Sequence, residues 1–326
     1  MKRAFLAALA LFVSLPFSTA TSEERSSKSK PNFVFILGAA HGWSSTSVDM
    51  DGAEPSHARP AGLTPHLERI AKDGMRFSEF YVSAPRCTPS RASFFTGISP
   101  AKLHMTYVNE GGKERRGSGE DVSDASQRVM PPAPLKELPE GVPTTGALLQ
   151  RQGYATAHFG KWHVGRIDPT RRGFDESDGP NTNQGPEPGA PNPKECFAIT
   201  ARGIEFMKAQ VKAETPFFLQ LSHYGVGTEE EATPECYAET MAALPRLSGK
   251  TLASAAGARD MDTAIGQVLA ALEELGNHDG EYGHGRGGIL EWSYAMRVER
   301  FPPPLVVDDG MYSGRTGNDG GQSSNY

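Results

Sequence analysis

A cysteine and an arginine, Cys87 and Arg91, stand one helical turn apart where the sequence predicts a helix to begin. Thr88 and Pro89 suit the N-cap and first turn of that helix, which we expect to end near Gly97. Backbone N–H groups at a helix start favour negative charge, and the guanidinium can return to the same end. A nucleophile beside a cation suits an anionic ester. On spacing alone, a buried structural cysteine beside an incidental surface arginine remains the simpler interpretation.

The surrounding pattern indicates an α/β protein. A continuous apolar run followed by Gly38 is typical of a buried strand, and Thr64 with Pro65 begins a helix that Gly74 ends. Such alternation predicts a mostly parallel sheet with helices on both faces. We expect strands at 32–37, 75–82, 154–159 and 216–222, helices at 64–74, 88–97, 144–152, 197–212 and 260–275, and long loops at 109–142 and 168–195.

Composition narrows the class of function. The formal net charge is -6, which argues against a nucleic-acid partner because such proteins normally carry a basic field. An anionic small molecule is still allowed, since one site can concentrate positive charge. Of the three cysteines, Cys196 and Cys236 could form a disulfide or remain as buried thiols, and the sequence leaves both open.

The two ends of the chain differ from its middle. Residues 1–20 combine Lys2 and Arg3, an apolar run and a small-x-small ending, which predicts a cleaved signal peptide and export to the periplasm or medium. An uncleaved anchor is the alternative, but the run is short for a stable membrane span, which needs about 20 residues. Residues 21–30 read as a polar linker. The tail, 277–326, is rich in glycine and has little periodicity, so we expect weak order there.

Two segments resemble a known family. The run from Cys87 to Gly97, CTPSRASFFTG, is similar to the sulfatase signature and includes the Cys-x-Pro-x-Arg core that formylglycine-generating enzymes read. The run from Gly153 to His163, GYATAHFGKWH, resembles the second sulfatase signature. Further matches in the family's order are 30–37, 173–175, 216–219 and 262–276, so the resemblance covers roughly residues 30 to 276.

The resemblance implies a residue-by-residue mechanism for a sulfatase-like catalytic domain at 31–276. Cys87 would be oxidised to formylglycine, whose hydrate attacks sulfur and later releases sulfate. Arg91 would hold the diol and the metal environment. Lys161 would bind the sulfate and the leaving-group side, and His163 would orient or deprotonate the diol. Outside this motif, a solvent-exposed lysine and a core histidine would be the simpler interpretation of the last two.

The chain departs from the family at two places that matter for binding. Sulfatases of this type carry two adjacent aspartates after the first strand as calcium ligands, but Ala39 and Ala40 occupy those positions here. Only Cys87, as formylglycine, is left as a metal ligand among the matched positions. After the strand at 216–222 the family has a sulfate-binding histidine, and Gly227 takes its place. His223 is therefore either a neighbouring substrate contact or a structural histidine, and we slightly favour the structural role.

A third departure follows residue 276, where the family continues into a strand and an Asp-Asn metal pair. Here a glycine-rich segment follows, in which Asn318-Asp319 faintly matches that pair in reverse. We do not expect residues 277–326 to form the family's smaller C-terminal subdomain. The loss of several metal ligands is expected to leave metal binding weak or absent. The reaction rate should fall as well, because even one preorganised donor commonly contributes about 100-fold or more in rate.

Three hypotheses therefore stay open. The first is a sulfuric-ester hydrolase for an aryl or carbohydrate sulfate, matured by a formylglycine-generating enzyme. The second is an inactive relative that binds sulfated glycans through Arg91, Lys161 and nearby histidines. The third is a truncated or frameshifted product with neither role. A phosphatase is less favoured, because Cys87 lies in a formylglycine motif and not in a serine or threonine nucleophile motif.

Overall fold

The chain divides by its contacts into two units, Met1–Lys30 and Pro31–Tyr326. The computed structural model describes residues 30–39, 41–50, 52, 59–60, 62–77, 80–108, 134–183, 190–277 and 287–293. The predicted signal peptide, nearly all of the linker and most of the tail lie outside the described residues. The fold reported below is that of the second unit.

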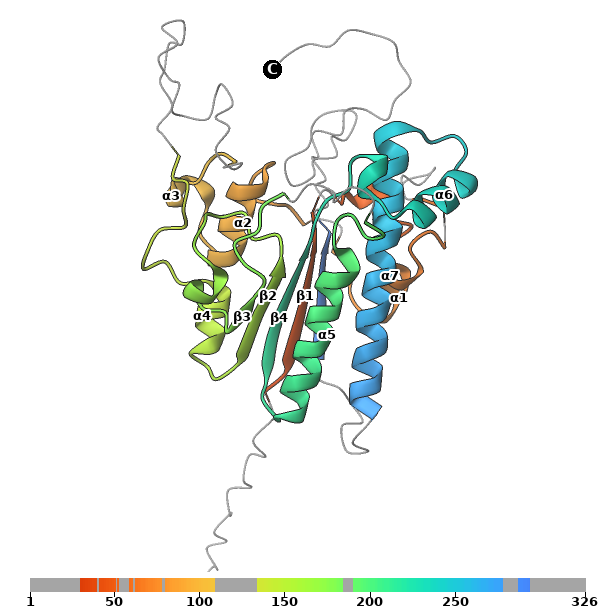
Figure 1. The fold of residues 1–326 in the computed structure, drawn as a ribbon. Coiled ribbons are helices and arrows are strands. Elements are labelled where there is room, and N and C mark those ends of the chain that lie inside the picture. Colours follow the sequence, from red (N-terminus) through yellow and green to blue (C-terminus); the bar gives the residue numbers. More distant parts are fainter. Residues whose placement is uncertain are drawn as a thin grey trace, which may run out of the picture. The chain divides into compact units, whose positions relative to one another are not determined.

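One five-stranded sheet forms the centre of this unit, in the order β3-β2-β4-β1-β5 (Figure 1). Each pair of neighbouring strands is parallel, so the predicted mostly parallel sheet is confirmed. Parallel strands need a crossover between them, which the intervening helices provide. The strands are β1 (Asn32–Gly38), β2 (Ala155–Gly160), β3 (Glu176–Ser177), β4 (Phe217–His223) and β5 (Gly287–Ser293).

Seven α-helices accompany the sheet in the described part of the chain. They are α1 (Pro65–Asp73), α2 (Cys87–Thr96), α3 (Pro100–Leu103), α4 (Thr145–Gln150), α5 (Cys196–Lys212), α6 (Pro234–Ala243) and α7 (Gly249–Asn277). Three short 3-10 turns lie at Trp43–Ser45, Pro169–Arg172 and Glu229–Glu231.

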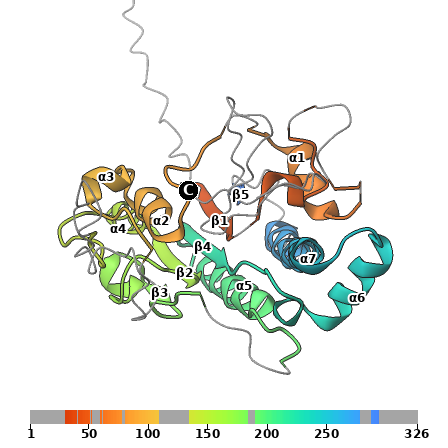
Figure 2. The same ribbon diagram turned by 90° about the horizontal axis from the view of Figure 1, so that it is seen from above.

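Alternate residues of β1 separate two hydrophobic cores. Val34 and Ile36 pack into one core with apolar side chains of α5 and α7. Phe35 and Leu37 pack into the other, with side chains of α2 and α3. Because successive strand residues point to opposite faces, helices must cover both faces of the sheet, and Figure 2 shows the two groups of helices separated by the strands.

The start of α1 is fixed by a residue far away in the sequence. Pro65 occupies its first turn, and the buried carboxylate of Asp262 on α7 accepts hydrogen bonds from the backbone N–H groups of His66 and Leu67, at 3.2 and 2.8 Å. These N–H groups have no partner within the helix. One carboxylate therefore caps α1 and joins it to α7.

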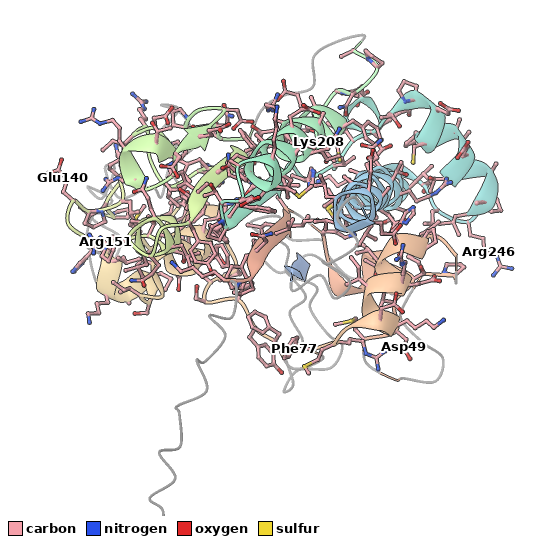
Figure 3. All side chains as sticks on the ribbon, turned by 90° about the horizontal axis from the view of Figure 1, so that it is seen from below. Asp49, Phe77, Glu140, Arg151, Lys208 and Arg246 are labelled. Atoms are coloured by element: carbon pink, nitrogen blue, oxygen red, sulfur yellow. The ribbon has the colours of Figure 1, made fainter. Side chains whose placement is uncertain are left out.

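Three predicted elements differ from the structure. No strand includes residues 75–77 or 80–82, and the strand predicted at 75–82 is wrong for those residues. Phe77 there is 58% exposed and stands out from the ribbon (Figure 3). Helix α2 begins at Cys87 with Arg86 as its N-cap, two residues before the expected cap, Thr88. Helix α7 begins at Gly249, well before the expected start at 260.

Within the tail, the sequence predicts little regular structure, yet the structure has β5 pairing with the whole length of β1. The weak order expected for the whole tail is therefore wrong for Gly287–Ser293. The reversed Asn318-Asp319 pair lies outside the described residues. Among the described helices, none combines the length and apolar character that a membrane crossing requires.

Replacing Asp262 by alanine should destabilise the fold, because two buried N–H groups would lose their acceptor. We expect the free energy of unfolding in urea to fall by about 2–3 kcal/mol. The matched control on the same helix is Glu273→Ala, which removes an exposed ion pair with Arg69 and should cost less than about 1 kcal/mol. Equal losses in the two variants would contradict the proposed capping role.

Candidate active site

The turn after β2 is the element that positions two of the predicted site residues. Gly160 ends the strand with φ of +94°, and a Cβ atom there would lie 2.2 Å from the backbone oxygen of Ser222 on β4. Only glycine tolerates both the conformation and the approach. The next residue, Lys161, donates its backbone N–H to that same oxygen at 2.8 Å.

A second segment satisfies the remaining backbone donors of this turn. The Asp178 carboxylate accepts from Gly160 N at 2.9 Å, and the Asn181 carbonyl accepts from Trp162 N and His163 N at 2.8 and 2.9 Å. His163 itself has φ of +56°, a region that side-chain-bearing residues seldom adopt. Strain of this kind persists only where surrounding bonds hold it, and it often marks a functional site.

Helix α2 is tied to the same turn. The Thr88 hydroxyl donates to the His163 carbonyl at 2.9 Å, and the Arg91 guanidinium donates to the Lys161 carbonyl at 2.7 Å. As a result, the Lys161 ammonium donates to Cys87 Sγ at 3.3 Å. All five side chains are at most 5% exposed. Cys87, Arg91 and Lys161 therefore lie around the same turn, to which His163 contributes its backbone carbonyl.

The electrostatics of this group favour an anion. Cys87 is the first residue of a ten-residue helix, where the backbone N–H groups carry partial positive charge. The Lys161 ammonium adds a full charge at the sulfur position, and water is largely excluded. A cation held in a dry site interacts more strongly with an anion than it would in water.

Trp162 stands between Lys161 and His163 and fixes the position of the turn that carries them. Its fully buried indole lies 4.3 Å from the Phe95 ring and also contacts Phe174, ring centre to ring centre. His158 belongs to the same cluster, and burial, together with the charge of Arg91, lowers its pKa to about 3. The aromatic cluster anchors the turn between the two candidate residues.

His223 lies apart from Cys87, at the end of β4. Its Nε2 is 3.0 Å from the Thr200 hydroxyl, and burial lowers its pKa to about 4. A second buried histidine, His41, follows β1, and its pKa is also lowered to about 4, by burial and by the nearby His223. Both rings line a pocket that does not include Cys87 or Lys161. The substrate contact predicted for His223 is therefore not supported by any contact with the cysteine group.

The residues described do not fit the calcium that the resemblance implies. Ala39 is buried and offers only a methyl group, while its backbone N–H donates to the His223 carbonyl at 3.1 Å. Gly227 donates its N–H to Glu231 and has no side chain to bind sulfate. Nowhere among the described residues do three His, Cys, Asp or Glu side chains form a set able to hold a metal. Ala40 lies outside the described residues.

Cys196 and Cys236 form no disulfide in this structure, so of the two alternatives the structure has the unpaired thiols. Cys196 and Cys236 both face Asp260. Burial, and then this carboxylate, raises the pKa of Cys196, and the same causes raise the pKa of Cys236 to about 12. These two thiols are thus poor nucleophiles, which separates them in character from Cys87 beside its lysine.

Sequence analysis missed three residues that shape the site. Asp178 and Asn181 support the turn after β2 from a loop that has no periodic pattern, and a run of Asp, Gly, Pro and Asn gives only a general turn signal. His41 follows the two alanines directly, but its position gives no sequence signal, because the motif at this point predicts carboxylates and not a histidine. The roles of all three residues depend on tertiary contacts that the sequence alone does not reveal.

Comparison with known proteins agrees with this geometry. The Sulfatase family model matches residues 31–280, which is most of the chain. The chain belongs to the sulfatase family. The predicted family is therefore confirmed.

Several curated sulfatases are similar to the chain. The N-acetylgalactosamine-6-sulfatase of Mus musculus is 29% identical over 281 residues, which is 76% of this chain and 48% of that protein. Arylsulfatase A of Bos taurus is 25% identical over 283 residues, 76% of this chain and 50% of that protein. The chain thus spans about half the length of these relatives.

Solved structures show the same sulfatase fold. Ps i-CgsB in complex with k-i-k-neocarrahexaose superposes with a TM-score of 0.58 at 22% identity, covering 77% of this chain and 56% of that chain. A protein of the Bacteroides thetaiotaomicron locus for glycosaminoglycan metabolism gives 0.55 at 16% identity, with 76% and 58% covered. At these identities the likeness concerns the fold alone.

Gly160→Ala should disrupt the site together with the fold, because the new methyl would meet a backbone oxygen that has no room to move. We expect a loss of roughly 3 kcal/mol or more in the free energy of unfolding. Gly97→Ala is the control, since Gly97 also has positive φ but open space around it, and it should cost only about 1 kcal/mol. Similar losses would show that the close approach to Ser222 is unimportant.

Acid should destabilise the protein between pH 6.5 and pH 5. His41, His158 and His223 have folded-state pKa values of about 4, 3 and 4, against 6.5 when unfolded. In this window the unfolded chain binds more protons, so stability falls as pH falls. We expect about 2 kcal/mol per histidine by pH 5, measured by urea unfolding. The slope should be shallower in His41→Gln, and a stability independent of pH over this window would contradict the assignment.

Proposed function

We propose that the site around Cys87 binds and hydrolyses sulfate esters through a formylglycine formed from this cysteine. The observation that carries the proposal is the buried Lys161 ammonium 3.3 Å from Cys87 Sγ, at the start of α2. That arrangement supplies positive charge around the atom from which a nucleophile would attack. Membership of the sulfatase family supports the same chemistry.

The thiol itself does not perform the reaction. A maturation enzyme that reads Cys87-Thr88-Pro89-Ser90-Arg91 would use dioxygen to oxidise the side chain to an aldehyde, with the thiol sulfur released as sulfide, and water converts the aldehyde to a gem-diol. One diol oxygen attacks sulfur, and the bond from sulfur to the ester oxygen breaks, so that the alcohol leaves with a proton. The second hydroxyl then loses its proton, the carbon–oxygen bond to sulfate breaks, and the aldehyde is restored.

Each basic side chain has a distinct task in this scheme. Lys161 holds a sulfate oxygen and offsets charge on the departing oxygen. His163 takes the proton of the diol, a role suited to an imidazole at the edge of the turn. Arg91 holds the diol from one side, while its bond to the Lys161 carbonyl keeps the turn in place. These assignments rest on the motif positions and on the shared location of the four residues.

A family calcium ion would neutralise sulfate charge and polarise the diol. Because Ala39 provides no oxygen ligand, no step here depends on calcium. The cations Lys161 and Arg91 must carry the stabilisation between them. We therefore infer slower turnover than in a sulfatase with the full set of carboxylates.

Because Ala39 supplies only a methyl group where the family has a metal ligand, binding without hydrolysis is a second candidate function. A site with cations but without metal ligands can hold a sulfate and fail to turn it over. We propose binding of sulfated glycans without hydrolysis as this alternative. The damaged-gene hypothesis predicts neither binding nor turnover.

Substrate class and location follow from the same inference. The relatives are named for N-acetylgalactosamine-6-sulfate and aryl sulfates, and a solved neighbour holds a neocarrahexaose, so we propose a sulfated carbohydrate or aryl sulfate as ligand. We also propose export of the chain after cleavage of residues 1–20, with 31–276 as the catalytic domain and 277–326 as a divergent tail.

Maturation and turnover are tested with protein co-produced with a formylglycine-generating enzyme. We expect the peptide containing Cys87 to lose the mass that separates a thiol from an aldehyde. Hydrolysis of nitrophenyl sulfate should be measurable, vanish in Cys87→Ala, and fall by about 100-fold or more in Lys161→Met. Cys236→Ala is the matched control and should keep the rate of the unmodified chain.

The outcomes separate the hypotheses. Turnover that depends on Cys87 supports the hydrolase. Binding of sulfate that needs Lys161, without turnover, supports the binding protein. A chain that aggregates, or in which Lys161→Met changes neither binding nor turnover, sinks both proposals.

A further inference from the structure

Asp178 follows β3 directly and places a carboxylate beside a site that is proposed to bind an anion. Its side chain is 12% exposed, and both of its oxygens accept the backbone N–H of Gly160 at 2.9 Å. The next residue along the chain is Lys161, whose ammonium is assigned to the sulfate. Because a carboxylate repels a sulfate, its presence at this point needs a physical reason.

The loop after β3 is held mainly by side-chain bonds. β3 has two residues and pairs with β2 at two positions, so the sheet itself gives this loop little support. Asn181 donates its side-chain amide to the carbonyl and to the carboxylate of Asp178, both at 3.1 Å. The Asn181 carbonyl in turn accepts two backbone N–H groups of the turn after β2. The position of Asp178 therefore determines where this loop meets the turn.

Arg202 on α5 supplies the positive charge that matches this carboxylate. Its Nη2 donates to Asp178 Oδ2 at 2.8 Å, whereas the Glu195 carboxylate is 4.0 Å away. Helix α5 is packed closely on β4 at this point, because a Cβ atom on the adjacent Gly203 would lie 2.6 Å from the side chain of Leu221. The backbone that carries Arg202 is therefore fixed by the core of the protein.

The charged form of Asp178 is the one that serves the turn. Burial raises the pKa of this carboxyl, while the Gly160 N–H and the Arg202 guanidinium oppose that rise. The ionised group accepts from both donors at once, whereas a protonated oxygen would offer less acceptor capacity. With Arg202 in place the pair has no net charge, so its field on a nearby anion largely cancels. The carboxylate can then hold the turn without repelling a sulfate.

We propose that Asp178 and Arg202 are positioning residues for the sulfate site, because together they fix the turn that carries Lys161 and add no net charge beside it. The inference rests on the proposed function, since it takes Lys161 as the cation that binds the sulfate. Neither Asp178 nor Arg202 touches the substrate in this scheme. Removal of the carboxylate should therefore weaken the binding of an anion, whereas the loss of its charge alone would strengthen that binding.

Calorimetry with inorganic sulfate, on the full chain produced without the maturation enzyme, tests this role. We expect Asp178→Ala to weaken sulfate binding about tenfold, because the Gly160 N–H loses its acceptor. Asp178→Asn keeps an oxygen for that N–H and should recover most of the affinity. The number of sites per chain should stay constant, since partial unfolding alone would lower that number and leave the dissociation constant unchanged. Sulfate binding by Asp178→Ala that equals or exceeds that of the wild type overturns the proposal.

A second variant covers the case in which Asp178→Ala does not fold. Arg202→Met leaves the carboxylate without its cation, so we expect about threefold weaker sulfate binding, which Arg202→Lys should restore. The ratio to wild type should persist in about 0.5 M sodium chloride, where the field of an exposed charge is strongly screened. Lys208→Met, which removes an exposed ion pair with Glu205 on the same helix (Figure 3), is the control and should bind like the wild type. A loss that disappears in salt, or that the control shares, contradicts the positioning role.

Failure of the proposed function gives a different result. In that case Lys161→Met leaves the affinity for inorganic sulfate unchanged, and the positioning role is refuted with it. If Lys161→Met abolishes sulfate binding while the Asp178 and Arg202 variants bind like the wild type, the sulfate site stands and the positioning role alone is refuted.

Discussion

At the end of β2, the backbone of Gly160 approaches the Ser222 carbonyl so closely that no side chain fits between them. The parallel pairing of β2 with β4 stops at this point, and the chain turns away from the sheet with its N–H groups facing outward. Those donors need partners, and Ser222, Asp178 and Asn181 supply them. The turn is therefore determined by backbone bonds before any catalytic side chain is considered.

Helix α2 attaches to this turn by the same kind of bond. Thr88 and Arg91 both donate to backbone carbonyls of the turn, so the helix that carries Cys87 is aligned with Lys161 by contacts that no ligand is needed to form. Preorganisation of this sort is what anionic chemistry requires, because charges that are already in place need no rearrangement during reaction.

Sequence patterns were informative where the determinants are local. The apolar run at Asn32 predicts a strand because both faces are covered, and Pro65 with Gly74 brackets a helix through their own backbone limits. The segment at 75–82 has a strand-like composition, yet Met75 and Phe77 are largely exposed, because strand formation depends on a partner that composition does not reveal. Cys87 was found through a compact motif. Asp178 and His41 act through contacts distant in sequence, and no pattern along the chain indicates them.

The position of Trp162 has an optical consequence. Its indole is packed against Phe95, with no exposed surface, and lies between two residues of the candidate site. Indole emission depends on the polarity and charge around the ring, so a shift of the neighbouring turn would change its wavelength and intensity. The protein therefore carries, inside its own core, a fluorophore that reports on the geometry of the site next to it.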